Sequence, residues 1–343
     1  MPIIDSATGS VSRDYTIEQL QQRADEMRVW NTLSLVAAGS GHLGGTLSIM
    51  DIAAALYLKH IHHDPKAPDW EDRDRVFWSV GHKAPALYVA LAMAGYFDDR
   101  PVSYHGEELE GFEGVSGLEQ TVLLRRLGSG FEGHPNRLKL QGLEASSGSL
   151  GQGLGIACGS ALHARMAGKD YTCYCIMGDG EHDEGSVWES VMFAAHHRLD
   201  NVVVIIDDNG MQIDGRADDV MHKHLLAEKY TAFDWKVIRC DGHDMADILR
   251  ALAEADAALT DLLEQNDGHY PPDYDGDHEP AWEPLTSKEW DAYRDHMQTV
   301  ADIIPDAKAI RENLPTTPPL ADDALIAASI QPDAPYLQAQ DFV

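Results

Sequence analysis

Two polar side chains stand where short apolar runs of the sequence end. Asp179 follows the run at 171–177, and Asn209 follows the run at 202–207. Each side chain offers an oxygen of the kind that Mg²⁺ and Ca²⁺ bind in proteins. Taken singly, the aspartate suits a helix N-cap and the asparagine a turn. Taken together they favour a metal site, provided that the fold brings the two run ends side by side.

The elements around these residues meet that condition. Both runs are short and almost continuously apolar, which is typical of strands buried on both faces of a parallel sheet. The segment 185–198 between them is long enough for a crossover helix, so the three form a βαβ unit. Parallel strands in such a unit end at the same edge of the sheet, where open α/β folds bind ligands. We therefore predict a doubly wound α/β fold with a mostly parallel sheet flanked by helices, and Asp179 beside Asn209.

Two glycines flank Asp179 and indicate that the metal would bind together with an anion. Gly178 and Gly180 allow backbone amides to approach an anion, and the helix expected after them favours negative charge at its N-terminus. A diphosphate fits this position, and its oxygens together with water would complete the octahedral shell of Mg²⁺. Two formal G-x-G-x-x-G matches, at 39–44 and 128–133, lack the strand–turn–helix context and predict no dinucleotide site.

Three histidines lie in glycine-flanked turns. His42 stands in SGHLGG, His82 in VGHKA and His134 in EGHPN. One histidine in such a turn carries little information. Three of them ahead of a glycine-rich turn are expected to converge, as general acid–base groups or as donors to phosphate.

The composition excludes some classes of partner. Asp and Glu number 57 against 26 Lys and Arg, and no basic stripe occurs, so we expect neither nucleic acid nor an anionic membrane as partner. The sequence shows no membrane span and no signal-peptide pattern, which favours the cytoplasm. The acid excess suits a salt-adapted cytoplasm or an ordinary acidic enzyme. Cys173 and Cys175 lie two apart in the expected strand, so they are expected to be buried filler and not metal ligands.

The rest of the chain supplies helices and a weaker C-terminal pattern. Helical patterns cover 16–38 and 49–61, the second half of 74–97, most of 146–169, and 244–265. A polar, proline-rich loop follows, and the tail from residue 314 is expected to face a partner or to be loosely ordered. We predict one domain over 1–290, which carries the expected metal and diphosphate site, and a helical or irregular C-terminal extension over 291–343.

Several segments together resemble one family. They are SGHLGG, VGHKAPALYVALAMAGYF, GHPN followed by GLEASSGSLGQGLGIA, and GDGEHDEGSVWE with LDNVVVIIDDNGMQIDG. They resemble the thiamine-diphosphate-binding half of transketolase, in the form whose two halves are separate chains. The resemblance runs from about residue 15 to about residue 245, and its spacing of 30 residues from Asp179 to Asn209 is highly specific.

The resemblance implies a role for each matching residue. Asp179, Asn209 and the backbone carbonyl of Met211 would bind Mg²⁺, for which Ca²⁺ or Mn²⁺ could substitute. Catalytic positions would be His42 and His134 near the substrate hydroxyl and carbonyl groups, His82 by the diphosphate, and Glu184 in a carboxylate pairing at the subunit interface. Thiamine diphosphate would be contacted by His82, Gly148, Leu150, Gly178, Asp179, Gly180, Glu181 and Asn209.

The implied activity is transfer of a two-carbon ketol unit from a ketose to an aldose, with sugar phosphates as the default substrates. A chain of this kind lacks the pyrimidine-binding domain and the glutamate that activates the cofactor. The resemblance therefore implies an obligate complex with a C-terminal transketolase subunit, and we expect a heterotetramer with two copies of each chain.

The sequence departs from the family pattern at three places. Leu43 replaces the usual proline, which affects loop stiffness. Lys83 replaces a small residue, either as a cation near the substrate or diphosphate or as a solvated lysine. In the diverged segment 260–290, Glu283 follows Trp282 where a histidine usually contacts the diphosphate, and a glutamate would repel phosphate.

The third departure leaves several functions open. The substrate could be specialised, with His269 or His278 reaching the site instead. Another thiamine-diphosphate reaction, such as decarboxylative carboligation of a 2-oxo acid, is a second alternative. A weakened cofactor site would instead favour a non-catalytic scaffold. Retention of Asp179, Asn209, Glu184 and the three loop histidines favours an enzyme.

Overall fold

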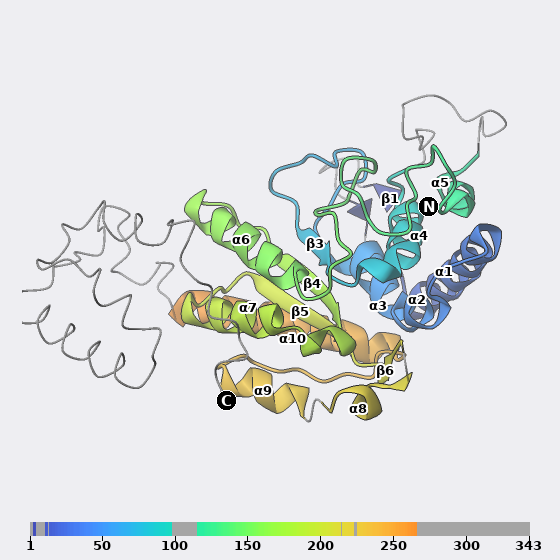
Figure 1. Cartoon of the computed structure of the whole chain (residues 1–343). Helices are drawn as coiled ribbons and strands as arrows, with labels where there is room; N and C mark the ends of the chain where they lie inside the picture. The colour runs from blue at the N-terminus through green and yellow to red at the C-terminus, as the bar shows by residue number, and fades with distance from the viewer. Residues whose placement is uncertain are drawn as a thin grey trace, which may run out of the picture. The chain divides into compact units, whose positions relative to one another are not determined.

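Three parallel strands form a sheet in the order β3–β4–β5 (Figure 1). They are β3 (Arg75–Trp78), β4 (Cys173–Gly178) and β5 (Val202–Asp207). The structure, a computed structural model, is described over residues 3–4, 11–12, 14–97, 115–213, 215–222 and 225–265. The strands predicted at 171–177 and 202–207 are confirmed, the first of them beginning and ending slightly later than expected.

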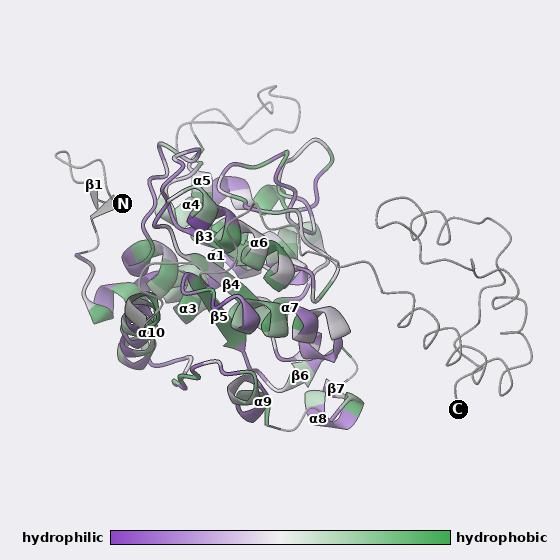
Figure 2. Cartoon of the chain, turned by 90° about the vertical axis from the view of Figure 1, so that its left-hand side faces the viewer, coloured by the Kyte–Doolittle hydropathy of each residue, from purple (hydrophilic) through white to green (hydrophobic). Residues whose placement is uncertain are grey.

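The sheet is buried on both faces, as the apolar runs predict. Cys173, Cys175 and Met177 pack in one core with residues of α6 (Gly153–Met166) and α7 (Gly185–His196). Tyr174 and Ile176, which alternate with them, pack in a second core with four other helices. These are α1 (Ile17–Ala38), α3 (Met50–Ala55), α4 (Ala84–Ala94) and α10 (Met245–Gln265). Helices therefore cover both faces, and the doubly wound α/β fold is confirmed; Figure 2 shows the hydrophobic residues gathered around β4 and β5. Both strand cysteines are free and buried, as predicted.

Helix α1 (Ile17–Ala38) ends at the predicted residue and begins one residue after the predicted start, with Thr16 as its N-cap. The Thr16 hydroxyl accepts a hydrogen bond from the Gln19 amide at 3.2 Å, and the Gln19 side chain accepts one from the Thr16 amide at 2.9 Å. This reciprocal pair satisfies two donors that the helix leaves without partners at its start. Gly39 ends the helix with a φ of 63°, which glycine adopts without a steric penalty.

The helix predicted at 49–61 changes type along its length. It consists of α3 (Met50–Ala55) followed by a π-helical turn, η1 (Leu56–His60). Side chains from both parts lie in the same core as α1. An apolar pattern alone does not distinguish an α-helical turn from a π-helical one, so the sequence could not reveal this change.

The remaining elements include α10, which confirms the helix predicted at 244–265. In chain order they are β1 (Ile3–Ile4), β2 (Val11–Ser12), α2 (Leu43–Ser48), η2 (Gly81–Lys83), α4 (Ala84–Ala94), α5 (Gly117–Gln120), η3 (Thr121–Leu123), η4 (Gly180–Asp183), β6 (Met211–Gln212), β7 (Gly215–Arg216), α8 (Ala217–Val220), α9 (Leu226–Ala232) and α10 (Met245–Gln265). Strand β1 pairs antiparallel with β2, and β6 pairs antiparallel with β7.

Several predictions fall on residues outside the described ranges. They concern the domain boundary at 290 and the residues His269, His278, Trp282 and Glu283. Within the part of the chain that is described, no helix is both long enough and apolar enough to cross a membrane.

Candidate active site

The carboxyl ends of β4 and β5 lie side by side, as predicted. Gly178 at the end of β4 is paired with Asp207 at the end of β5, and the Asp179 amide donates to the Asp207 carbonyl at 3.2 Å. Two residues further on, the Asn209 side-chain amide donates to Oδ2 of Asp207 at 3.3 Å. Asp179 and Asn209 thus flank one residue, Asp207, at the same edge of the sheet.

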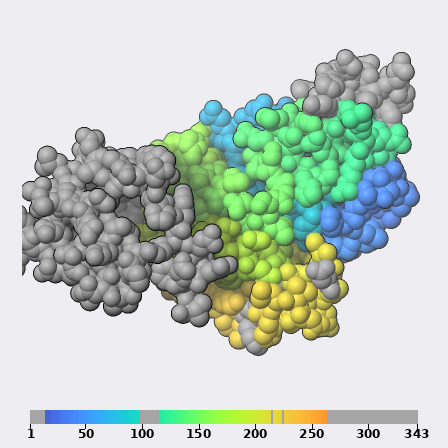
Figure 3. Space-filling view, viewed as in Figure 1, coloured from blue at the N-terminus to red at the C-terminus, as the bar shows by residue number. Residues whose placement is uncertain are grey.

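The segment after Asn209 folds back towards the turn that holds Asp179. The Met211 amide donates to Oδ1 of Asn209 at 3.0 Å, and Met211 begins the β6–β7 hairpin. A Cβ atom on Gly180 would lie 2.9 Å from Cγ of Gln212, so the two segments are in close contact at that glycine. In Figure 3, the segment that contains this hairpin (yellow) and the loops of residues 115–150 (green) lie on the same face.

The three loop histidines converge near this edge. The rings of His42 and His82 lie 5.3 Å apart between centroids, at 70° to each other. His134 packs closely against Gly148: a Cβ on that glycine would lie 3.3 Å from Cδ2 of the imidazole. Burial, Lys83 and the other two histidines lower the pKa of His82 to about 4. Burial, followed by the charges of Arg125 and His134, also lowers the pKa of His42.

The loop that holds Gly148 and Leu150 is pressed against the loop that holds His82. A Cβ on Gly81 would lie only 2.6 Å from the backbone nitrogen of Gly148. No side chain fits between the two loops at this point, so glycine is required there for packing. The contact places Gly148, one of the predicted cofactor contacts, next to His82.

The two glutamates of the GDGEHDE segment have different surroundings. Glu181 is 2% exposed, and its carboxylate accepts hydrogen bonds from the Ser79 hydroxyl at 2.7 Å and from the amides of Gly151 and Gly178 at 2.9 and 3.1 Å. Burial raises the pKa of the Glu181 carboxyl. Its side chain therefore holds the Gly151 loop to the turn after β4. Glu184 is exposed at the N-terminus of α7.

Lys83 is neither solvated nor at the surface. It is 1% exposed, and its ammonium group forms an ion pair with Oδ2 of Asp207. Of the two alternatives for Lys83, the solvated lysine was therefore wrong: the side chain packs against Gly45 and reaches the end of β5. A lysine is almost never fully buried without a partner, and Asp207 supplies that partner.

This geometry agrees with what comparisons with known proteins show. Residues 19–263 match the family model described as "Transketolase, thiamine diphosphate binding domain". The chain belongs to the transketolase family. A transketolase from Campylobacter jejuni has the same fold with a TM-score of 0.63 and 31% identity, and the match covers 71% of this chain and 37% of that one.

Among transketolase family members, two similar relatives are named as subunits. One is the 6-deoxy-6-sulfo-D-fructose transketolase subunit SqwG of Clostridium sp. (strain MSTE9), 38% identical over 70% of this chain and 80% of its own length. Another is an apulose-4-phosphate transketolase subunit of Phocaeicola vulgatus, 35% identical over 70% of this chain and 78% of its own length. Human transketolase is 33% identical, but the match covers only 37% of its length.

The residues at the strand ends suit the cofactor of a transketolase. Asp179, Asn209 and the Met211 carbonyl would supply three hard oxygens for a divalent cation, which leaves room for diphosphate oxygens and water. The Gly180 amide, at the start of η4, would donate to the diphosphate. The sequence analysis did not single out Asp207 or Ser48, although Asp207 is the acidic last residue of the run at 202–207 and could have been noticed on that ground.

Proposed function

We propose that this chain is the cofactor-binding subunit of a two-chain transketolase, which transfers a two-carbon ketol unit between a ketose and an aldose. The observation that carries the proposal is the adjacency of Asp179 and Asn209 at the ends of neighbouring parallel strands. The relatives that match over most of their length and are named as transketolase subunits support the two-chain form.

Bound thiamine diphosphate would supply the nucleophilic carbon that accepts and releases the ketol unit. The chain's own residues would hold it in place. Asp179, Asn209 and the Met211 carbonyl would bind Mg²⁺, and the Gly180 amide would donate to the diphosphate. Gly148 and Leu150 would lie against the aminopyrimidine ring.

The histidines would handle protons and sugar hydroxyl groups. Because its pKa is about 4, the His82 imidazole is neutral near pH 7 and has one donor nitrogen and one acceptor nitrogen. A neutral histidine can donate to a phosphate oxygen or relay a proton without adding a fixed positive charge. His42 and His134, both exposed, would face the substrate from the two neighbouring loops.

The partner would be a C-terminal transketolase subunit with the pyrimidine-binding domain. Glu184 is exposed in the single chain, which suits a residue that pairs with a carboxylate across a subunit interface. We propose a heterotetramer of two chains of each kind, with sugars that carry a phosphate or another anionic group as substrates.

Titration calorimetry tests the cofactor site. Thiamine diphosphate is titrated with Mg²⁺ into this chain, alone and mixed with its partner subunit. We expect Mg²⁺-dependent binding that tightens with the partner and is lost in Asp179→Asn. The matched control is Asp170→Asn, an exposed position just before β4, at the opposite edge of the sheet.

Activity of the mixed chains tests the reaction. Ketol transfer from phosphorylated and sulfonated ketoses is compared with decarboxylation of a 2-oxo acid. Transfer that requires both chains supports the proposal, and decarboxylation without transfer points to a carboligase. Absence of cofactor binding in every mixture would favour a scaffold and overturn the proposal.

A further inference from the structure

Asp207 is a carboxylate placed where a metal ligand is expected. It ends β5, is paired with Gly178 of β4, and accepts the Asp179 amide at its carbonyl, 3.2 Å away. Carboxylates are stronger ligands for Mg²⁺ than side-chain amides, yet the proposed ligand set uses Asn209, two residues later. Something must therefore keep the Asp207 carboxylate away from the metal.

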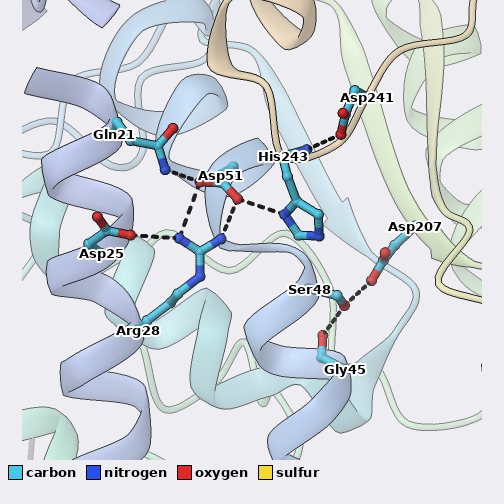
Figure 4. A network of polar contacts seen from close by, with 9 residues as sticks. All are labelled: Gln21, Asp25, Arg28, Gly45, Ser48, Asp51, Asp207, Asp241 and His243. Carbon is cyan, nitrogen blue, oxygen red and sulfur yellow. Dashed lines mark hydrogen bonds and ion pairs between the residues drawn. The ribbon is translucent and has the colours of Figure 1, made fainter. Parts of the chain in front are cut away.

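Three donors meet at one oxygen of this carboxylate. Oδ2 of Asp207 pairs with the Lys83 ammonium group, accepts the Ser48 hydroxyl at 2.5 Å, and accepts the Asn209 amide nitrogen at 3.3 Å. Figure 4 shows Ser48 of α2 between the Gly45 carbonyl and Asp207. The contacts join α2, η2 and the end of β5.

Lys83 is the only one of these three donors that carries a charge. Its side chain is 1% exposed and that of Asp207 is 9% exposed, so neither charge is compensated mainly by water. A Cβ on Gly45 would lie 3.1 Å from Cε of Lys83 and 3.7 Å from Nε2 of His82, so the start of α2 packs directly against the lysine side chain. The ion pair therefore compensates the buried negative charge of Asp207 within the protein.

The same pair fixes which way the Asn209 amide faces. Only the amide nitrogen can donate to the Asp207 carboxylate, so the amide oxygen must face away from it. That oxygen accepts the Met211 amide at 3.0 Å and keeps a second lone pair. With Asp207 held in place, this lone pair is available at the strand ends.

We infer that Lys83 is a positioning residue of the metal site: it holds the Asp207 carboxylate beneath α2, so that the Asn209 oxygen and not Asp207 faces the cation. The inference rests on the proposed function. It also accounts for a lysine at a place where a small residue was expected.

The test measures the affinity of the protein for Mg²⁺ alone as well as for the cofactor. Replacing a residue with a merely structural role would not strengthen Mg²⁺ binding. Lys83→Met removes the charge and keeps an apolar side chain of similar length. Without its ammonium partner, Asp207 joins Asp179 as a ligand, so we expect affinity for Mg²⁺ alone to rise roughly tenfold. The extra negative charge repels diphosphate, so affinity for thiamine diphosphate with Mg²⁺ should fall roughly tenfold or more.

The double variant Lys83→Met/Asp207→Asn provides the second arm. It replaces a buried ion pair by neutral groups of similar size, which folded proteins often tolerate. We expect affinity for Mg²⁺ alone to return to the wild-type value, and cofactor affinity to recover most of its loss. A double variant that binds cofactor no better than Lys83→Met would overturn the inference.

The matched control is Arg165→Met. Arg165 pairs with Asp200 at 2.6 Å, with side chains 15% and 7% exposed, at the far end of α6 from the metal site. Its loss should lower the midpoint of thermal unfolding without changing affinity for Mg²⁺. If Lys83→Met behaves like this control while the wild type binds cofactor, the inference fails and the proposed function stands. If the wild-type complex binds no cofactor, both fail.

Discussion

Arg28 of α1 donates to both carboxylate oxygens of Asp51, a residue of α3 that is 1% exposed (Figure 4). The side chains of Gln21 and His243 also donate to Asp51, each at 2.9 Å, and His243 lies just before α10. One buried carboxylate therefore connects α1, α3 and the segment that leads into α10. These elements enclose one face of the sheet, so the contact concerns stability and not chemistry.

Replacing Asp51 with asparagine should destabilise the fold. The change removes the buried anionic partner of Arg28, which is 24% exposed and keeps its ion pair with the exposed Asp25 at 3.1 Å. We expect a loss of about 2–3 kcal/mol in the free energy of unfolding, below the range for fully buried pairs because of this exposure and the remaining pair. Urea denaturation measures the difference. The control is Arg23→Gln, which removes a half-exposed pair with Glu26 and should cost about 0.5 kcal/mol or less. Equal losses in the two variants would contradict the prediction.

The same carboxylate should make stability depend on acid pH. Burial of Asp51 opposes ionisation, but the hydrogen bonds from Arg28, His243 and Gln21 outweigh it and leave the pKa below its usual value. A lowered pKa means that the stabilisation is complete above the unfolded value of about 4 and is lost as the pH falls through the lower folded value. When the pH is lowered through about 4, the free energy of unfolding should therefore fall less in Asp51→Asn than in the wild type. Denaturation curves recorded above and below that pH measure the two differences.

Local sequence patterns predict the sheet and part of the site, but not the contacts between residues that lie far apart in the chain. The strands, the crossover helix α7 and the adjacency of Asp179 and Asn209 follow from apolar runs and their spacing, so the sequence predicts them. The partners of Asp207 do not follow from such patterns. Lys83 and Ser48 lie 124 and 159 residues away in the chain, and His243 lies 192 residues from Asp51. No local pattern encodes contacts of that separation, and a lysine seen in the sequence alone is expected to be solvated.

His82 should titrate well below an ordinary histidine. Burial, Lys83, His42 and His134 lower its pKa to about 4, whereas the unfolded value is about 6.5. Between these values the unfolded chain takes up a proton that the folded chain does not, so the folded state loses stability as the pH falls. The free energy of unfolding, measured by urea denaturation, should therefore fall less between about pH 7 and about pH 5 in His82→Gln than in the wild type.

A control separates this effect from the loss of any histidine. His163→Gln changes an exposed position on α6, outside the cluster of His42, His82 and His134, and so removes a histidine without altering that cluster. If His82→Gln and His163→Gln show the same pH dependence, His82 does not titrate at a lowered pKa.

The contact between Gly81 and Gly148 should make Gly81 sensitive to a single methyl group. The atoms that an alanine Cβ would meet, at 2.6 and 2.7 Å, belong to the backbone of Gly148 and Ser147 and cannot rotate away. Gly81→Ala should therefore displace the loop of residues 146–150, cost about 1–3 kcal/mol of unfolding free energy, and weaken thiamine diphosphate binding.

Gly159→Ala is the matched control, since nothing lies within 4 Å of its Cβ position in the interior of α6. There alanine should stabilise the helix by about 0.5–1 kcal/mol and leave cofactor binding unchanged. Both variants add one methyl group, so opposite signs in denaturation would show that the close approach of the two loops, and not glycine content, sets the requirement at Gly81.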